Sequence, residues 1–172
     1  VASATDIYVR KDYFIEASSI LGINNSSLVV DTASTITNNI GGIREQSVSQ
    51  IIKIDADKIC KVGTLFGTYQ RTNQSKLSVT ITEVESNNII WNGYYKVSEL
   101  LDNTVNYIEF DSVKVKRGAY YKVDYKAEDT TDNDFITIYY NESLDNDVQQ
   151  CTLIDNKEQS YNLCLQLYSP IE

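Results

Sequence analysis

The sequence predicts an all-β fold, a jelly-roll-like antiparallel β-sandwich with a short N-terminal helical or extended appendage. Two observations predict it. From Val48 onward, apolar and polar residues alternate with a period of two, as in strands with one buried and one solvated face. Turn-forming residues separate roughly ten such stretches at intervals of about 8–15 residues, a spacing typical of sandwiches and barrels.

Residues 1–45 precede this pattern, and we expect them to form an N-terminal appendage or linker. Within them, Val9, Tyr13 and Ala17 begin an apolar series at helical spacing over residues 6–21. The pairs and triplets of apolar residues around Val9 and Tyr13 also suit a strand, so both alternatives stay open. Residues 24–47 are rich in Asn, Ser, Thr and Gly, and they predict loops around one short strand at residues 27–30.

Residues 46–172 form the predicted sandwich domain. The clearest alternation lies in residues 77–81, 121–125, 136–140 and 163–167. We expect further strands near residues 48–54, 58–68, 88–95, 105–110, 112–116 and 150–154, and one helical turn at residues 96–101.

Charge and composition exclude several classes of function. The chain has 172 residues, with 15 basic and 24 acidic side chains and a net charge of −9. That charge argues against nucleic acids and anionic membrane surfaces as partners. No run of apolar residues approaches the ~18 that span a bilayer, so we expect no membrane insertion.

The chain has no histidine, which rules out a Ser-His-Asp triad, a Cys-His pair and histidine-ligated metals. Among its 24 acidic residues no pair is marked out as a glycosidase pair. We therefore expect a binding module and not an enzyme.

The first residue is Val1, and the chain has no methionine. Either a targeting peptide has been removed or the domain belongs to a longer chain, and we favour the longer chain. There are three cysteines, Cys60, Cys151 and Cys164, and we expect free thiols in a reducing compartment. A disulfide between Cys151 and Cys164 is the alternative.

The most unusual feature of the composition is its high tyrosine content, with 13 tyrosines in the chain. Three adjacent pairs lie in predicted strands and begin at Tyr94, Tyr120 and Tyr139. Because neighbours on a strand point to opposite faces, each pair sends one ring outward, and the pattern favours Tyr120 and Tyr139 as outward members. The outward member of the first pair is undecided, and Trp91 shares the face of Tyr95.

Exposed rings on a rigid sheet suit sugars, because the C–H face of a pyranose stacks on an aromatic ring. The alternative is that tyrosine simply favours strands and keeps its hydroxyl in water. Loop residues 67–73 add polar side chains, with an ordinary turn as their alternative. The candidate carbohydrate-binding residues are Tyr69, Arg71, Asn73, Trp91, Tyr94, Tyr120 and Tyr139.

An acidic loop at residues 128–134 contains Asp129, Asp132 and Asp134. Carboxylate oxygens at this spacing are candidate calcium ligands, although the loop lacks the glycine and terminal glutamate of an EF-hand. A solvated acidic turn is the alternative. We expect no required cofactor, with calcium as the one candidate.

One resemblance extends over residues 46–141. It is carried by residues 66–73, 77–81, 98–103, 117–121 and 136–140. In these the chain resembles the β-sandwich accessory domains attached to bacterial glycosyltransferases of surface-polysaccharide biosynthesis, which are similar to jelly-roll carbohydrate-binding modules. The resemblance implies a non-catalytic module of a larger glycan-processing protein, with an oligo- or polysaccharide as its partner and the bacterial cytoplasm as its location.

The alternative function is structural. An N-terminal helix, a β-domain and a cysteine pair near the C-terminus would also suit a pilin-like or adhesin-like assembly domain of a surface appendage or virion. Such a protein would lie at the cell surface, and a Cys151–Cys164 disulfide would favour it.

Overall fold

The computed structural model describes residues 26–142, 147 and 149–171. The helix considered for residues 6–21 lies outside them. Within the described ranges no α-helix occurs, and a single 3₁₀ turn, η1 (Val97–Glu99), confirms the predicted helical turn. No helix of this part of the chain is long and apolar enough to cross a membrane.

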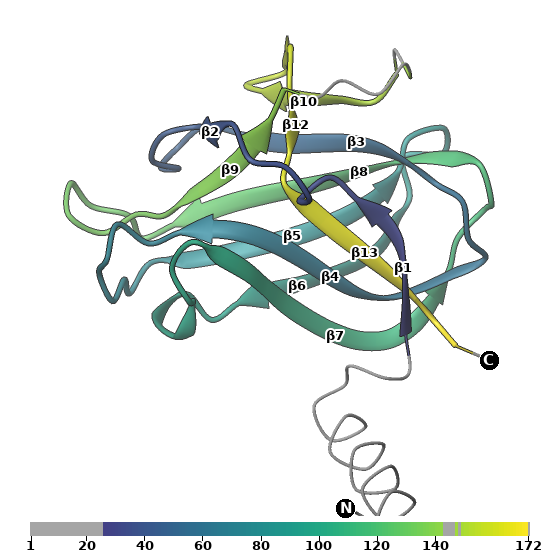
Figure 1. The fold of residues 1–172 in the computed structure, drawn as a ribbon, viewed down its shortest axis with the longest axis horizontal. Helices are drawn as coiled ribbons and strands as arrows, with labels where there is room; N and C mark the ends of the chain where they lie inside the picture. Colours follow the sequence, from purple (N-terminus) through teal and green to yellow (C-terminus); the bar gives the residue numbers. More distant parts are fainter. Residues whose placement is uncertain (1–25, 143–146, 148, 172) are drawn as a thin grey trace, which may run out of the picture.

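Two antiparallel sheets pack face to face, which confirms the predicted all-β sandwich (Figure 1). The six-stranded sheet has the order β11 (Lys157–Gln159), β10 (Cys151–Ile154), β3 (Val48–Ile54), β8 (Ala119–Glu128), β5 (Lys76–Glu83) and β6 (Ile89–Tyr95). The seven-stranded sheet has the order β1 (Ser26–Asp31), β13 (Leu165–Pro170), β4 (Lys58–Gly67), β9 (Thr137–Asn141) and β12 (Asn162–Leu163), with β2 (Asn38–Asn39) paired to β9 and β7 (Thr104–Lys114) paired to β4.

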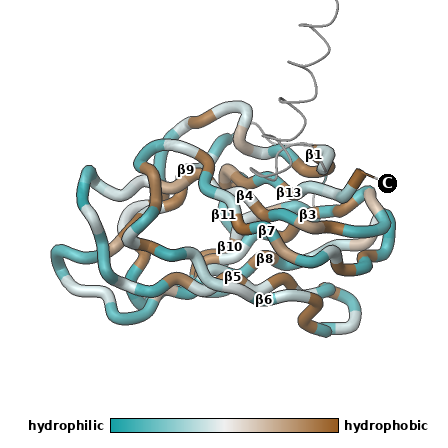
Figure 2. Tube along the Cα trace, turned by 90° about the horizontal axis from the view of Figure 1, so that it is seen from below, coloured by the Kyte–Doolittle hydropathy of each residue, from teal (hydrophilic) through white to brown (hydrophobic). Residues whose placement is uncertain are grey.

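The core lies between the sheets and follows the predicted alternation. In β5 Leu77, Val79 and Ile81 are buried, and in β8 Tyr121, Val123 and Tyr125 are buried. Figure 2 shows the resulting alternation of hydrophobic and hydrophilic residues along the strands. Burial of such side chains removes apolar surface from water and is the main favourable contribution to folding.

The predicted domain boundary at residue 45 needs a correction for residues 26–45. Strand β1 pairs with β13, and Ile43, fully buried, bridges Ile136. These residues are therefore part of the sandwich and not a linker. A second correction concerns residues 104–114, which form one strand with a bulge in its pairing to β4 where two strands were expected.

A cluster of hydroxyl groups lies at the centre of the core. Thr64 on β4 has its Oγ1 2.7 Å from the Tyr125 hydroxyl and 3.0 Å from the Tyr95 hydroxyl. The Tyr95 hydroxyl also donates to the carbonyl oxygen of Asn106 at 3.1 Å. The ring of Phe66 meets Tyr95 edge-on at 4.7 Å. These contacts fix the position of Tyr95, and with it the end of β6.

Burial of this cluster makes the protein sensitive to alkali. Desolvation raises the pKa of both Tyr95 and Tyr125 above the ordinary tyrosine value. Because both pKa values are higher in the folded protein, the two hydroxyl groups ionise first in the unfolded chain as the pH rises. Ionisation then favours the unfolded chain, and the folded state loses stability. We expect the free energy of unfolding, measured in urea, to fall as the pH rises above ~10. The fall should be shallower in Tyr95→Phe, and a constant value would contradict the account.

The three cysteines are unbonded, so the expectation of free thiols is confirmed and the Cys151–Cys164 disulfide is absent. Cys164 is buried, and burial raises its pKa to about 12. Cys60 and Cys151 are half-buried. All three thiols are thus held in their protonated, weakly reactive form at neutral pH.

Candidate functional site

The outer face of β4 carries two glycines that are covered by tyrosine rings. Val62, Thr64 and Phe66 point into the core, so Gly63 and Gly67 face outward. A Cβ placed on Gly63 would lie 2.7 Å from Cε1 of Tyr107, and one placed on Gly67 would lie 3.2 Å from Cε2 of Tyr139. Glycine within a strand is destabilising by itself. Here the missing side chain is what lets each ring approach the sheet.

Hydrogen bonds fix both rings in place. The Tyr107 hydroxyl donates to Oε1 of Gln166 at 3.0 Å, and Tyr168 donates to the same oxygen at 3.0 Å. The Tyr107 and Tyr168 rings meet edge-on at 5.9 Å. Burial, with a smaller contribution from Tyr107, raises the pKa of Tyr168 to about 12. The Tyr139 hydroxyl donates to Oδ1 of Asn103.

Beyond Gly67 the chain turns and presents a further ring. Tyr69 and Gln70 have φ values of 56° and 57°, in the left-handed region that a turn requires. The guanidinium carbon of Arg71 lies 5.1 Å from the Tyr69 ring centre and 4.6 Å from that of Phe135. Nη2 of Arg71 donates to the carbonyl oxygen of Phe135 at 3.0 Å, which holds the turn against the next loop.

These tyrosines define a surface that we call the tyrosine track, consisting of Tyr69, Tyr107, Tyr139 and Tyr168. Tyr107 is 48% exposed and Tyr69 is 41% exposed, whereas the other two are half-buried. Burial raises the pKa of Tyr139, and Asp102 and Tyr69 contribute to the rise. Tyr69 lies two residues beyond Gly67, the last residue of β4, so the track continues from the sheet into the loop.

Asn73, a candidate carbohydrate-binding residue, lies inside this loop. Its side chain is buried, and Nδ2 donates to the carbonyl oxygen of Thr68 at 3.1 Å. The turn over residues 68–73 needs this internal bond because its backbone leaves the strand ladder. Asn73 therefore supports the loop from inside and is not exposed at its surface.

The acidic loop divides its carboxylates among separate partners. Asp129 lies 3.3 Å from Nζ of Lys76, and Asp132 accepts from Nη1 of Arg44 at 2.7 Å. Asp134 accepts from two backbone N–H groups, at 2.8 and 3.0 Å, and these bonds lower its pKa. Within the described residues no three His, Cys, Asp or Glu side chains form a metal-binding group. Calcium binding by Asp129, Asp132 and Asp134 stays a prediction.

The other three candidate residues lie away from the track. Trp91 shares the inward face of Tyr95, as predicted, and it stacks on Phe110 at 4.2 Å and covers Gly93, so this candidate residue is not an exposed ring. Tyr120 lies on the outer face of the six-stranded sheet, as predicted, and donates to Asp147 at 2.6 Å. Tyr94 also faces outward and is 72% exposed, because its neighbour Tyr95 is the buried member of the pair.

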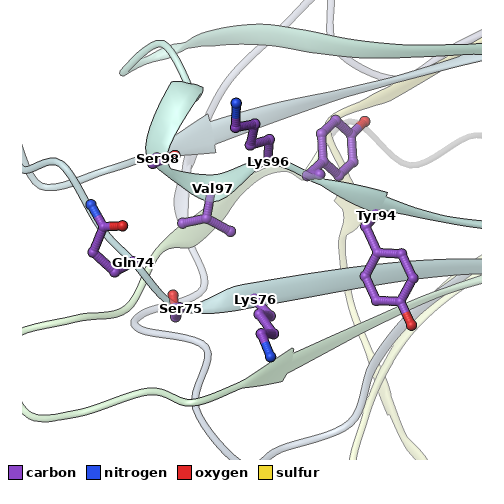
Figure 3. Close-up of a pocket in the computed structure, with 8 residues that line it drawn as sticks. Gln74, Ser75, Lys76, Tyr94, Lys96, Val97 and Ser98 are labelled. Atoms are coloured by element: carbon purple, nitrogen blue, oxygen red, sulfur yellow. The ribbon is translucent and has the colours of Figure 1, made fainter.

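Tyr94 borders a shallow hollow of about 390 Å³ at the end of β6. Figure 3 shows Tyr94 and Lys76 projecting from neighbouring strands to the same side, with Gln74, Val97 and Ser98 around them. The hollow offers one exposed ring and several polar groups, and it is the second candidate surface of the molecule.

The sequence analysis did not identify Tyr107, Tyr168, Phe135 or Gln166. One signal was present: Gly63 lies inside a predicted strand, where a glycine indicates close approach of another group. Which group approaches depends on strand pairing, since Tyr107 and Gln166 both stand opposite Gly63 in the sheet.

No family model matches the chain, and no curated protein matches it significantly.

Proposed function

We propose that the protein is a non-catalytic carbohydrate-binding module, an accessory domain of a larger glycan-processing protein. The observation that supports this most strongly is the pair of tyrosine rings seated over Gly63 and Gly67. A ring held on a rigid sheet offers a ready surface to the C–H face of a sugar. Because its orientation is fixed in advance, binding costs little ordering of the protein.

Polar groups accompany the rings. The amide oxygens of Gln166 and Asn103 accept hydrogen bonds from the tyrosine hydroxyls, and their amide nitrogens donate to Asp31 and Asp102. Each amide nitrogen has a second N–H that a sugar hydroxyl can accept from. Sugar hydroxyls exchange bonds with water for bonds with such groups, so each bond contributes a modest net free energy. Stacking that buries about 200 Å² of apolar surface contributes on the order of 5 kcal/mol before ordering costs. Weak affinity follows from this balance.

We expect Tyr107→Ala to lower glycan affinity about tenfold, because an aromatic contact contributes about 0.5–1.5 kcal/mol beyond its buried area. The wild type is first screened on a glycan array that includes bacterial surface polysaccharides. The variant is then compared by titration calorimetry on the glycan that binds. Its melting temperature should stay within a few degrees of the wild type.

Tyr94→Ala is the matched control, since Tyr94 is the exposed tyrosine of the other sheet. Loss of binding in this variant alone would move the site to the hollow at the end of β6. A wild type that binds nothing on the array would contradict the proposal and favour a structural role in an assembly.

A further inference from the structure

We propose that the ligand is an internal stretch of a neutral, linear polysaccharide that lies along β4, and not a single terminal sugar. This inference rests on the carbohydrate-binding function proposed above. It follows from the length of the tyrosine track, from the fixed geometry of its rings, and from the charges along it.

The track is longer than one sugar. Gly63 and Gly67 are four residues apart on one strand, so the points covered by Tyr107 and Tyr139 are roughly 13 Å apart at ~3.3 Å per residue. A pyranose is about the size of one tyrosine ring and cannot cover both. Tyr69 lies beyond the end of β4 and lengthens the track further. Only a chain of several sugars contacts all these rings at once.

The rings are held by partners on different strands, which keeps their spacing constant. Tyr107 on β7 is bonded to Gln166 on β13, and Tyr139 on β9 is bonded to Asn103 before β7. Backbone pairing of β4 with β7, β13 and β9 joins all of these elements. A linear polymer with a regular repeat suits such a fixed spacing, because every ring can be occupied without rearrangement of the protein.

The charges favour a neutral polymer. Two cations beside the track are shielded by aromatic rings: Nζ of Lys61 lies 4.1 Å from the Tyr168 ring centre, and the Arg71 guanidinium lies 5.1 Å from the ring centre of Tyr69 and 4.6 Å from that of Phe135. Lys61 is buried, and Asp31 binds Gln166 at the edge of the track. With a net charge of −9 on the whole chain, a polyanionic glycan would be repelled.

Covering of glycines by rings has a second explanation, since such contacts also stabilise sheets. A purely stabilising role predicts that removal of a ring lowers the melting temperature without any effect on binding. The test therefore needs a readout of ligand length, which packing alone cannot change.

The experiment uses the whole chain and native affinity gels containing neutral polysaccharides (mixed-linkage β-glucan, xylan, galactomannan) or acidic ones (alginate, polygalacturonate). Oligosaccharides cut from a retained polymer, from disaccharide to hexasaccharide, are then titrated by calorimetry. We expect affinity to rise about tenfold or more across the series, as linked contacts add. Tyr107→Ala and Tyr69→Ala should each remove most of that rise and change disaccharide binding little, and Tyr94→Ala should preserve it.

Equal affinity for disaccharide and hexasaccharide would overturn the inference and leave the carbohydrate-binding function intact. Preferential retention by the acidic gels would overturn the neutral class. Retention by none of the gels, together with an empty array, would overturn the function and the inference together. A rise with length that survives both track variants would place the chain elsewhere on the surface and also overturn the inference.

Discussion

Replacement of Gly63 by alanine is expected to abolish most glycan binding and to destabilise the fold by about 1–3 kcal/mol. The new Cβ would lie 2.7 Å from the Tyr107 ring and 2.8 Å from Cγ1 of Val105, closer than carbon atoms approach. Because Gly63 lies in the middle of a ten-residue strand paired on both sides, the backbone resists movement and the ring must shift. Urea unfolding and glycan titration measure the two losses.

A double-mutant cycle tests the cause. If the ring is what the new methyl group meets, Gly63→Ala/Tyr107→Ala should lose less stability than the two single variants added together. Binding should stay low in all three variants. Additive losses would show that the new methyl group destabilises the protein through Val105 or the backbone and not through the Tyr107 ring. Gly67→Ala probes the second ring, since its new Cβ would lie 2.9 Å from Cγ2 of Thr137 and 3.2 Å from Cε2 of Tyr139.

Thr64→Val should destabilise the protein by about 2–3 kcal/mol although it preserves the size of the side chain. The hydroxyl of Tyr125 is fully buried and uses Thr64 as its partner at 2.7 Å. Tyr95 keeps the Asn106 carbonyl oxygen, so most of the cost comes from the unsatisfied hydroxyl of Tyr125. The loss is read from the midpoint of urea unfolding at constant slope.

Thr64→Val/Tyr125→Phe should be more stable than Thr64→Val alone, because it removes the stranded hydroxyl group. Thr80→Val, on the outer face of β5, is the control and should stay within about 0.5 kcal/mol of the wild type. A Thr64→Val loss as small as that of the control would show that the cluster contributes little.

The alternation of residue types was sufficient to predict most of the sandwich. In β3, β5 and β8 every inward position is apolar except Gln50 and Glu83, so periodicity and burial coincide. Strand β1 differs, because among its residues only Val30 is buried. Its place in the sheet depends on backbone hydrogen bonds to β13, which the pattern of apolar and polar residues does not reveal.

The candidate site was predictable only in part. Periodicity correctly placed Tyr120 on an outer face, and it placed Trp91 on the same face as Tyr95. It could not show that this shared face is the inner one. The Tyr139–Tyr140 pair does not consist of one buried and one exposed ring, since both rings are half-buried and Tyr140 stacks on Tyr161 at 4.0 Å. Tyr107 and Tyr168 meet through the register of three strands, which a single sequence does not specify.

The pairing of β1 with β13 also determines how the domain responds to tension. Ser26 stands opposite Pro170, so the outer ends of the two strands lie side by side (Figure 1). A force that pulls these ends apart acts along the interstrand hydrogen bonds, which run perpendicular to the strands, and breaks them in succession from one end. Such unzipping requires far less force than shearing all of the bonds at once. Under tension at these two ends, β1 and β13 are therefore expected to separate first, at the Ser26–Pro170 end of their pairing.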